Sequence, residues 1–269
     1  MVDTYLEPTG NPKNDRQIRK ELGLKRNPLR IFLKTLFTIF FVAALIVGNA
    51  VIFHNLYYRS FFVNGQSMYP TLNGNATYSN GTLIGQTYNS GSLNGATVDY
   101  GIMDTHEYTK QGIRRFDIIV TKYSETDASD KIKRVIALPG ETFYFVSTQK
   151  KEATNGDLYV IPEGASEGVF VPQNFGDEEI LRDKDYFGVN IPNIDNPLTL
   201  GADEYYVLGD NRDHSSDSSS SYGPIKYEWI EGVAIALEGT CTLVCEPGKA
   251  CQAGRVRFMW PQSLRWRDA

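Results

Sequence analysis

Several features are scarce in this sequence, and each shortage excludes a class of protein. The chain of 269 residues has a net charge of -5, so no basic excess points to nucleic acid as a partner. No histidine lies near Cys241, Cys245 and Cys251, so a zinc site at these cysteines would lack a fourth ligand. Beyond residue 57, no amphipathic helical pattern exceeds two turns. We therefore expect no metal, no cofactor and no nucleic acid, and an external part built mainly of β-strands.

The long apolar run near the N-terminus lacks the marks of a cleaved signal peptide. No Ala-x-Ala site closes it, the basic segment before it is too long, and the run exceeds a typical apolar signal region. Nineteen residues without a charge extend from Thr35 to Phe53, and as a helix they span about 28 Å, close to the hydrocarbon thickness of a bilayer. We therefore expect an uncleaved transmembrane helix at residues 35–56, in which Asn49 would have to face backbone or another helix.

Basic residues are concentrated before this run. Residues 1–34 contain eight lysines and arginines against four acidic residues. Positively charged flanks of a transmembrane helix stay on the cytoplasmic side. We therefore expect residues 1–34 in the cytoplasm and, after a single pass, residues 57–269 on the outer face of the membrane.

The part after the helix shows short apolar segments between turn residues, which is the pattern of strands. A strand at residues 60–63 leads into a serine-containing segment, and residues 116–120 and 131–138 predict two more strands. Further strands are expected at 142–147, 157–161, 205–208 and 232–237. Residues 73–112, rich in Asn, Gly, Ser and Thr, are expected to be a long surface loop, and residues 148–200 another insertion.

One of these predicted strands carries two basic residues on opposite faces. Side chains alternate along a strand, so Lys133 is expected to share a face with Val135 and Ala137. Arg134 then points to the other face. A lysine acts as a base only when it is neutral, which requires an apolar environment that lowers its pKa.

A constrained serine is the first candidate for chemistry. Ser67 follows Gly65, which allows a ligand to come close to the backbone, and Pro70 restricts the conformation of the residues around it. A serine hydroxyl needs a base before it can act as a nucleophile. Lys133 is one candidate for that base.

A polar loop at residues 209–218 supplies an alternative. Considered alone, a loop of this composition is more often a solvated turn than a functional site. His214 lies in it and is the second candidate base for Ser67. Asp210 or Asp217 would complete such a triad, because triads are defined by geometry and not by chain order.

Four segments with constrained or charged residues occur in one order behind the expected anchor. They are Gly65–Leu72, Arg115–Val120, Lys133–Glu141 and Gly209–Ser218, with a further tail at Gly254–Pro261. Together they resemble the type I signal peptidases, the bacterial leader peptidases that use a Ser–Lys dyad. The resemblance implies an antiparallel β-sheet catalytic domain with long insertions, anchored in the bacterial plasma membrane. It also implies a serine endopeptidase that cleaves N-terminal signal peptides from exported precursors, with membrane lipids as further partners.

The resemblance assigns roles at the reacting centre. Ser67 matches the nucleophile and Lys133 the general base. Ser215 matches the hydroxyl that orients the lysine amine. Two residues before the nucleophile some relatives carry a serine that stabilises the oxyanion, whereas this chain has Gly65 and offers only a backbone N–H there.

The resemblance also implies a structural ion pair between Asp210 and Arg134, which would tie the polar loop to the lysine strand. One departure concerns Asp217. The family usually has an arginine two residues after this aspartate, and this chain has Ser219. We expect Arg212 or water to replace that arginine as the partner of Asp217, with an effect on loop stability rather than on catalysis.

The cysteines are expected in an oxidising compartment outside the membrane. Pro247 and Gly248 predict a turn that brings Cys245 towards Cys251, so these two are the leading candidates for a disulfide. Cys241 would then be left over. The pairing among the three stays open at this point.

A second function, from a different class, fits the same scaffold. The chain would then be a membrane-anchored binding or assembly factor in which catalysis is dispensable. Some relatives of the family lack the serine or the lysine. This chain has both Ser67 and Lys133, which argues against that alternative.

Overall fold

The computed structural model divides the chain into two compact units. The described residues are 13, 14, 18, 20, 28–84, 92–146, 156–173, 191–220 and 222–264. The first unit ends at Leu56 and the second begins at Tyr57. The first contains the apolar helix, and the second contains all of the described strands.

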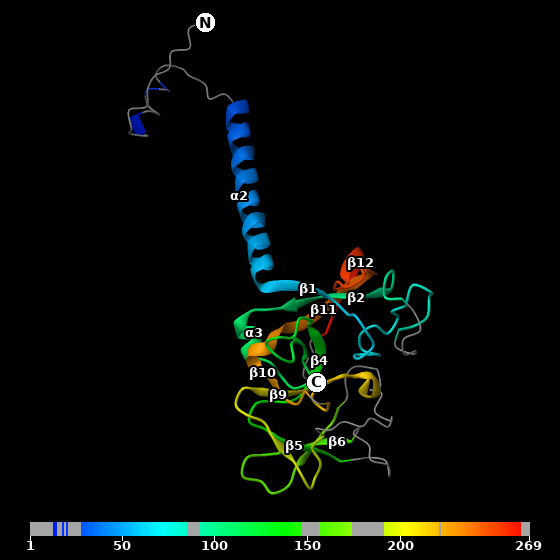
Figure 1. Cartoon of the computed structure of the whole chain (residues 1–269). Helices are drawn as coiled ribbons and strands as arrows, with labels where there is room; N and C mark the ends of the chain where they lie inside the picture. The colour runs from blue at the N-terminus through cyan, green and yellow to red at the C-terminus, as the bar shows by residue number, and fades with distance from the viewer. Residues whose placement is uncertain are drawn as a thin grey trace. The chain divides into compact units, whose positions relative to one another are not determined.

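The first unit is dominated by one long helix, α2, which runs over Pro28–Tyr57 (Figure 1). It begins before the expected span of 35–56 and includes Arg30 and Lys34 in its first turns. Its 30 residues span about 45 Å, which is more than the thickness of the hydrocarbon core of a bilayer. Long basic side chains near a helix end, such as those of Arg30 and Lys34, can reach the polar interface. Among the described residues, α2 alone is long and apolar enough to cross a membrane.

Polar side chains inside α2 donate hydrogen bonds to backbone carbonyls one turn earlier in the helix. Thr35 and Thr38 donate to the carbonyls of Ile31 and Lys34 at 3.0 and 2.9 Å. The amide of Asn49 donates to the carbonyl of Leu45 at 2.8 Å. These bonds satisfy polar groups that would otherwise be costly in lipid, Asn49 in particular.

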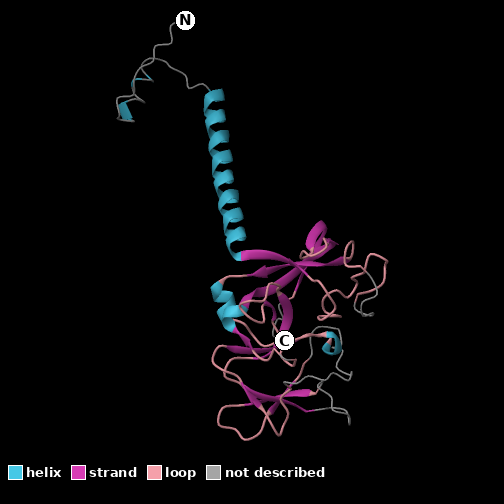
Figure 2. Ribbon diagram, in the orientation of Figure 1, coloured by secondary structure: helices cyan, strands magenta, loops and turns pink. Residues whose placement is uncertain are grey.

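The second unit consists mainly of antiparallel strands in two sheets (Figure 2). Along the path of the eight-stranded sheet the strands are β1 (Tyr58–Phe62), β2 (Thr97–Asp104), β11 (Ile230–Val244), β3 (Ile118–Thr121), β4 (Lys131–Ala137), β9 (Glu204–Leu208) and β10 (Ile225–Lys226), and β12 (Gln252–Ser263) pairs with β11. The four-stranded sheet has the order β7 (Val169–Val171), β6 (Asp157–Ile161), β5 (Thr142–Val146) and β8 (Leu198–Thr199). The helical pieces described in this unit are α3 (Glu107–Gln111) and 3₁₀ turns at Arg212–His214 and Tyr227–Trp229. The expected mainly β, antiparallel architecture is confirmed.

Several predicted strands are present with small changes of boundary. The strand at 157–161 is β6, and β4, β5 and β9 match their predictions to within about one residue, with Ser147 outside the described residues. Strand β3 begins two residues later than expected, because Phe116 has a positive φ of 73°, which does not fit a strand. Strand β11 is longer than the predicted 232–237 and has 15 residues. The described parts of residues 148–200 carry β6, β7 and β8.

The prediction of a surface loop at residues 73–112 is wrong for residues 97–104. They form β2, which pairs with β1 on one side and with β11 on the other. Gly101 obscures this strand in the sequence, because glycine is unusual in strand interiors. A Cβ on Gly101 would lie 2.7 Å from the ring of Phe61 and 2.5 Å from the carbonyl oxygen of Ala236, so the packing of the sheet requires glycine there.

Strand β4 carries Lys133 and Arg134 at successive positions, so their side chains leave the strand on opposite sides. The pairing of β4 with β9 shifts register between Val135 and Ala137. A bulge of this kind changes the alternation of side chains. The prediction that Ala137 shares the face of Lys133 is therefore wrong, and Ala137 packs in the same apolar cluster as Ile136.

Candidate active site

Ser67 lies on a short segment that follows β1, the strand at one end of the larger sheet. The side chains of Met68 and Leu72 are fully buried in the core and hold this segment in place. Gly65 has a φ of 126, a conformation that residues with a side chain rarely adopt. Ser67 is half-buried between these anchors.

Lys133 contacts Ser67 across 66 positions of sequence. Its Nζ lies 2.9 Å from the Oγ of Ser67 and donates to the carbonyl of Ile132 at 2.9 Å. Lys133 is only 3% exposed. The carbonyl of Ile132 and the hydroxyl of Ser67 therefore fix the direction of a buried amine.

Burial is the main influence on this amine. It lowers the pKa of Lys133 from 10.5 to about 8, because an ammonium ion loses its hydration in the interior. Of the neighbouring charges, Asp217 raises the pKa, Lys131 lowers it, and Asp210 raises it. A substantial fraction of the amine is then neutral at mildly alkaline pH. A neutral amine at 2.9 Å can accept the proton of the Ser67 hydroxyl.

Asp210 and Arg134 form a buried, two-point ion pair. Arg134 Nε donates to Oδ1 at 2.8 Å and Nη2 donates to Oδ2 at 2.6 Å, and the two side chains are 3% and 1% exposed. Thr71 Oγ1 donates to the same Oδ2 at 2.6 Å, and Arg134 Nη1 donates to the carbonyl of Phe116 at 2.9 Å. The pair thus links β4, the polar loop and the serine segment, and these bonds offset the cost of burying two charges.

The polar loop contacts the serine segment directly. The N–H of Asn211 donates to the carbonyl of Ser67 at 3.0 Å, and its Nδ2 donates to the carbonyl of Gln66 at 3.2 Å. Gly209 lies against the same Ser67 carbonyl and against the buried Ser215. A Cβ on Gly209 would lie 2.4 Å from the Ser67 oxygen and 2.6 Å from the Cβ of Ser215, so this approach requires glycine.

The carboxylate of Asp217 has partners that sequence reasoning missed. Its Oδ1 accepts hydrogen bonds from the hydroxyl and the N–H of Ser219 at 2.6 and 3.1 Å, and its Oδ2 accepts one from the N–H of Gly209 at 2.9 Å. Ser219 and Gly209 therefore supply the donors that were expected from Arg212 or water. Arg212 donates to the carbonyl of Gly209 at 3.1 Å and to the side chain of Gln173 at 2.9 Å.

The acids considered for a triad with His214 are held by other groups. Asp210 is bound by Arg134 and Thr71, and Asp217 by the loop donors just described. His214 itself ends the 3₁₀ turn, where its N–H donates to the carbonyl of Asn211 at 3.0 Å. The arrangement favours Lys133 over His214 as the base for Ser67.

Sequence reasoning also missed Asn73, which directly follows the serine motif. It is fully buried, with a φ of 62. Its Nδ2 donates to the carbonyls of Val63 and Gly65 at 2.7 and 2.8 Å, so one side chain holds the backbone before Ser67 in two places. The available signal was its residue type, because asparagine adopts a positive φ more readily than most residues with a side chain.

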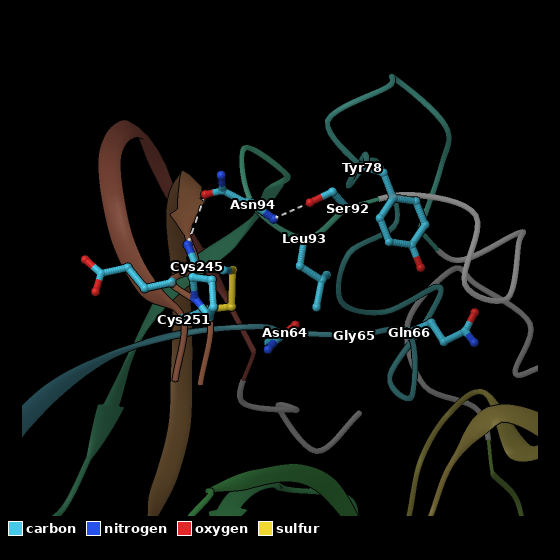
Figure 3. Close-up of a pocket in the computed structure, with 11 residues that line it drawn as sticks. Asn64, Gly65, Gln66, Tyr78, Ser92, Leu93, Asn94, Cys245 and Cys251 are labelled. Carbon is cyan, nitrogen blue, oxygen red and sulfur yellow. Dashed lines mark hydrogen bonds between the residues drawn. A yellow bond between two sulfur atoms is a disulfide. The ribbon is translucent and has the colours of Figure 1, made fainter. Parts of the chain in front are cut away.

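A cavity of about 620 Å³ borders the segment that precedes Ser67 (Figure 3). Residues 64–66 line one side of it, Tyr78 and residues 92–94 line others, and the disulfide between Cys245 and Cys251 completes the wall. The N–H of Cys245 donates to the side chain of Asn94 at 3.0 Å, which connects this disulfide to the turn beside it. The lining of the cavity next to the nucleophile segment is mixed, with amide side chains beside apolar groups such as Leu93.

The remaining cysteine, Cys241, is a buried free thiol in the apolar cluster behind the cavity. Burial raises the pKa of this thiol, and the charge of Asp99 acts in the same direction. In the described part of the chain, no three His, Cys, Asp or Glu side chains are grouped so as to hold a metal ion.

Comparison with known proteins gives these residues a family context. A family model described as signal peptidase, peptidase S26, matches residues 33–237. Signal peptidase I T of Bacillus subtilis (strain 168) is 27% identical over 188 residues, which are 69% of this chain and 76% of that protein. A signal peptidase I of Bacillus amyloliquefaciens is 26% identical over 191 residues, which are 70% and 77% of the two chains. Among solved structures, a signal peptidase I of Enterococcus faecalis V583 is 28% identical, covers 45% of this chain and 95% of its own, and has a TM-score of 0.32.

Proposed function

Because the chain belongs to the signal peptidase family S26, we propose that it is a membrane-anchored serine endopeptidase that cleaves N-terminal signal peptides from exported precursors with Ser67 and Lys133. The observation that carries the proposal is the 2.9 Å contact between the Lys133 amine and the Ser67 hydroxyl. The lysine is buried there, which is the environment that makes an amine available as a base.

In the proposed reaction, the neutral amine of Lys133 accepts the proton of Ser67 while the serine oxygen attacks the carbonyl carbon of the scissile bond. The tetrahedral intermediate then breaks the C–N bond. The lysine ammonium gives its proton to the leaving amine of the mature protein, and the signal peptide stays on Ser67 as an ester. Water attacks that ester with the same amine as base, which releases the signal peptide and restores the serine.

The backbone would stabilise the negative oxygen of the intermediate. We assign the N–H of Ser67 as one donor. Gly65 has no hydroxyl, so a second donor from this segment would have to be another backbone N–H. Loss of a single donor of this kind typically costs about 10²- to 10³-fold in kcat, so the conformation of this segment matters to the rate.

An extended precursor would pair with the outer edge of β1 and the residues that follow it. The backbone of Val63 is already paired: its N–H donates to the carbonyl of Asp99 in β2 at 3.0 Å, and its carbonyl accepts the side-chain amide of Asn73 at 2.7 Å. Because alternate residues of a strand direct their backbone groups to opposite edges, those of Phe62 face the outer edge of β1. Main-chain bonds along this edge would supply affinity, and shallow pockets would select small residues before the cut.

The proposed location is the bacterial plasma membrane, with α2 as a single anchor. The eight basic residues among positions 1–34 would keep that end in the cytoplasm and place the second unit on the outer face, where precursors emerge. The partners would be signal-peptide-bearing precursors and membrane lipids.

The test is cleavage of a purified precursor by the full-length chain in detergent or lipid. Ser67→Ala and Lys133→Ala are each expected to reduce kcat/KM by about 10⁴-fold or more, as loss of a nucleophile or its base does in other serine proteases. His214→Ala is expected to stay within a few-fold of wild type. Lys226→Ala, which removes an exposed lysine of β10, is the matched control for Lys133→Ala. Strong loss in His214→Ala with activity kept in Lys133→Ala would replace the dyad by a triad. A wild-type chain that does not cleave, but still binds precursor equally well after Ser67→Ala, would favour the binding or assembly factor.

A further inference from the structure

The hydrogen bonds to the carboxylate of Asp217 come entirely from uncharged donors among the described residues, and this carboxylate makes no ion pair with them. They are the hydroxyl and N–H of Ser219 and the N–H of Gly209. Asp217 is 1% exposed and Ser219 is 3% exposed. Within the described part of the chain, the carboxylate is therefore held by hydrogen bonds from neutral groups and has no ion-pair partner.

This carboxylate is connected to the reacting centre through Gly209. Its Oδ2 holds the N–H of Gly209 at 2.9 Å, and Gly209 is the residue that packs on the Ser67 carbonyl and on Ser215. The hydroxyl of Ser219 at 2.6 Å fixes the other oxygen, so the plane of the carboxylate is set from both sides. A rotation of Asp217 would release Gly209 from its place beside Ser67.

The charge of Asp217 also acts on Lys133. The ionisable groups that influence this lysine are Asp217, Lys131 and Asp210, and among them Asp217 has the largest electrostatic effect. Asp210 is held by the guanidinium of Arg134 in a buried ion pair. Of these two carboxylates, Asp217 is the one that makes no ion pair among the described residues, so Lys133 is the cation on which its charge acts.

From these contacts we propose that Ser219 is a positioning residue that acts through Asp217, holding Gly209 against the nucleophile segment while leaving the carboxylate without an ion-pair partner among the described residues. The proposal rests on the proposed function of Ser67 and Lys133. An arginine at position 219, usual in the family that the chain resembles, would hold the same carboxylate but cancel its charge. The serine therefore makes Lys133 a stronger base than an arginine at position 219 would. As a result, activity rises at a higher pH in this chain than in a chain with that arginine.

The charge part of the proposal is tested without relying on cleavage. The ionisation of Lys133 is followed by NMR titration of lysine carrying ¹³C at Cε, assigned with Lys133→Met. In Asp217→Asn and in Ser219→Arg, the Lys133 titration is expected to move to lower pH by about half a unit to one unit, because the carboxylate that favours the ammonium is removed or neutralised. In Ser220→Ala, which removes a hydroxyl that donates to the Asp217 carbonyl at 2.5 Å and spares the carboxylate, no shift is expected. Circular dichroism checks that each variant is folded. If Ser219→Arg does not fold, the titration of Asp217→Asn alone tests the charge part of the proposal.

The positioning part is tested on cleavage. Ser219→Ala is expected to lower kcat by about five- to tenfold, as for the loss of one hydrogen bond to a buried charge, with little change in KM. Ser219→Thr keeps the hydroxyl and is expected to restore most of the rate. In Asp217→Asn, the acid limb of the kcat/KM profile is expected to follow the NMR titration to lower pH.

Two results would overturn the proposal. One is a Lys133 titration in Asp217→Asn that coincides with wild type. The other is equal activity of Ser219→Ala and Ser219→Thr. A wild-type chain that fails to cleave any precursor would count against the proposed function instead, and the NMR titration would still decide the effect of Asp217 on Lys133.

Discussion

Asn73 and Asp99 hold each other through both backbone and side chain. The N–H of Asn73 donates to the Asp99 carboxylate at 2.6 Å, and the N–H of Asp99 donates to Oδ1 of Asn73 at 2.8 Å. Burial raises the pKa of Asp99, and the bond from Asn73 acts in the opposite direction. Since Asp99 belongs to β2, this reciprocal contact connects the sheet to the backbone that precedes Ser67.

Loss of the Asn73 side chain should therefore loosen the nucleophile segment. Asn73→Gly keeps the positive φ without strain but removes the bonds to Val63 and Gly65, and it is expected to destabilise the chain by about 1–3 kcal/mol. Asn73→Ala adds backbone strain and should be worse by about 1 kcal/mol. Urea unfolding and kcat/KM are the measurements. Wild-type values in Asn73→Gly would show that the two amide bonds do not support the segment.

The rate of cleavage should depend on the ionisation of Lys133. Since the neutral amine is the base, kcat/KM is expected to rise with pH through about 8, the pKa to which burial lowers this lysine, and to level off well below 10.5. A pH–rate profile with a non-ionising substrate measures this. A rising limb near the ordinary lysine value would contradict a buried base.

The same ionisation makes a prediction for stability. The pKa of Lys133 is about 8 in the folded chain and near 10.5 when unfolded, so below pH 8 the buried ammonium opposes folding. Lys133→Met should remove this cost and raise stability at pH 7 by on the order of 3 kcal/mol. Between pH 8 and 10.5 the unfolded wild type binds more protons, so its stability rises with pH and the difference between the two proteins shrinks. Thermal melts of both proteins across this range check the sign, and a constant difference would refute it.

The pair of Asp210 and Arg134 should behave as a unit. Asp210→Ala leaves a buried guanidinium with fewer partners and is expected to cost about 3–5 kcal/mol. The double variant with Arg134→Met should cost clearly less than the sum of the single changes. Denaturant unfolding of the four proteins gives the coupling. Additive effects would mean that the ion pair is energetically unimportant.

Gly209 offers a steric test of the loop contact. Gly209→Ala places a methyl group against the Ser67 carbonyl and Ser215, so we expect a strong loss of activity and a cost of about 1–3 kcal/mol. Gly112→Ala is the matched control, because a Cβ there meets only ordinary contacts, the nearest at 3.4 Å. Activity and melting temperature are measured for both. Equal behaviour of the two variants would argue against the close packing at Gly209.

Part of the fold could be read from local pattern. Strands β4, β5, β6 and β9 were expected because each combines a short apolar run with flanking turn residues. Strand β2 could not be recognised, since Asp99 and Gly101 interrupt its apolar pattern and its burial comes from β1 and β11 on either side. Strand β12 was missed for a different reason, because most of its side chains are exposed and no apolar alternation marks it.

The site shows the same division. Ser67 and Lys133 could be nominated from their local settings and from the resemblance, whereas the pair of Asp210 and Arg134 was expected from the resemblance alone. The partner of Asp217 could not, although Ser219 is only two residues away, because which donor reaches a carboxylate depends on how the loop turns. Asn73 was equally hidden: its two carbonyl acceptors lie eight and ten residues earlier and come into reach only when the chain folds back.

Order along the chain is thus enough to establish an uncharged helix long enough for a bilayer, a β-rich outer part and a short set of reactive side chains, because composition and periodicity act over a few neighbouring residues. Folding in three dimensions settled the rest: a hydroxyl and an amine from positions 67 and 133 at 2.9 Å, and a buried carboxylate at position 217 that accepts a hydrogen bond from the hydroxyl of Ser219 at 2.6 Å. Such relations depend on how distant strands pack and on which groups are buried away from water. Neither can be predicted from a short stretch of residues.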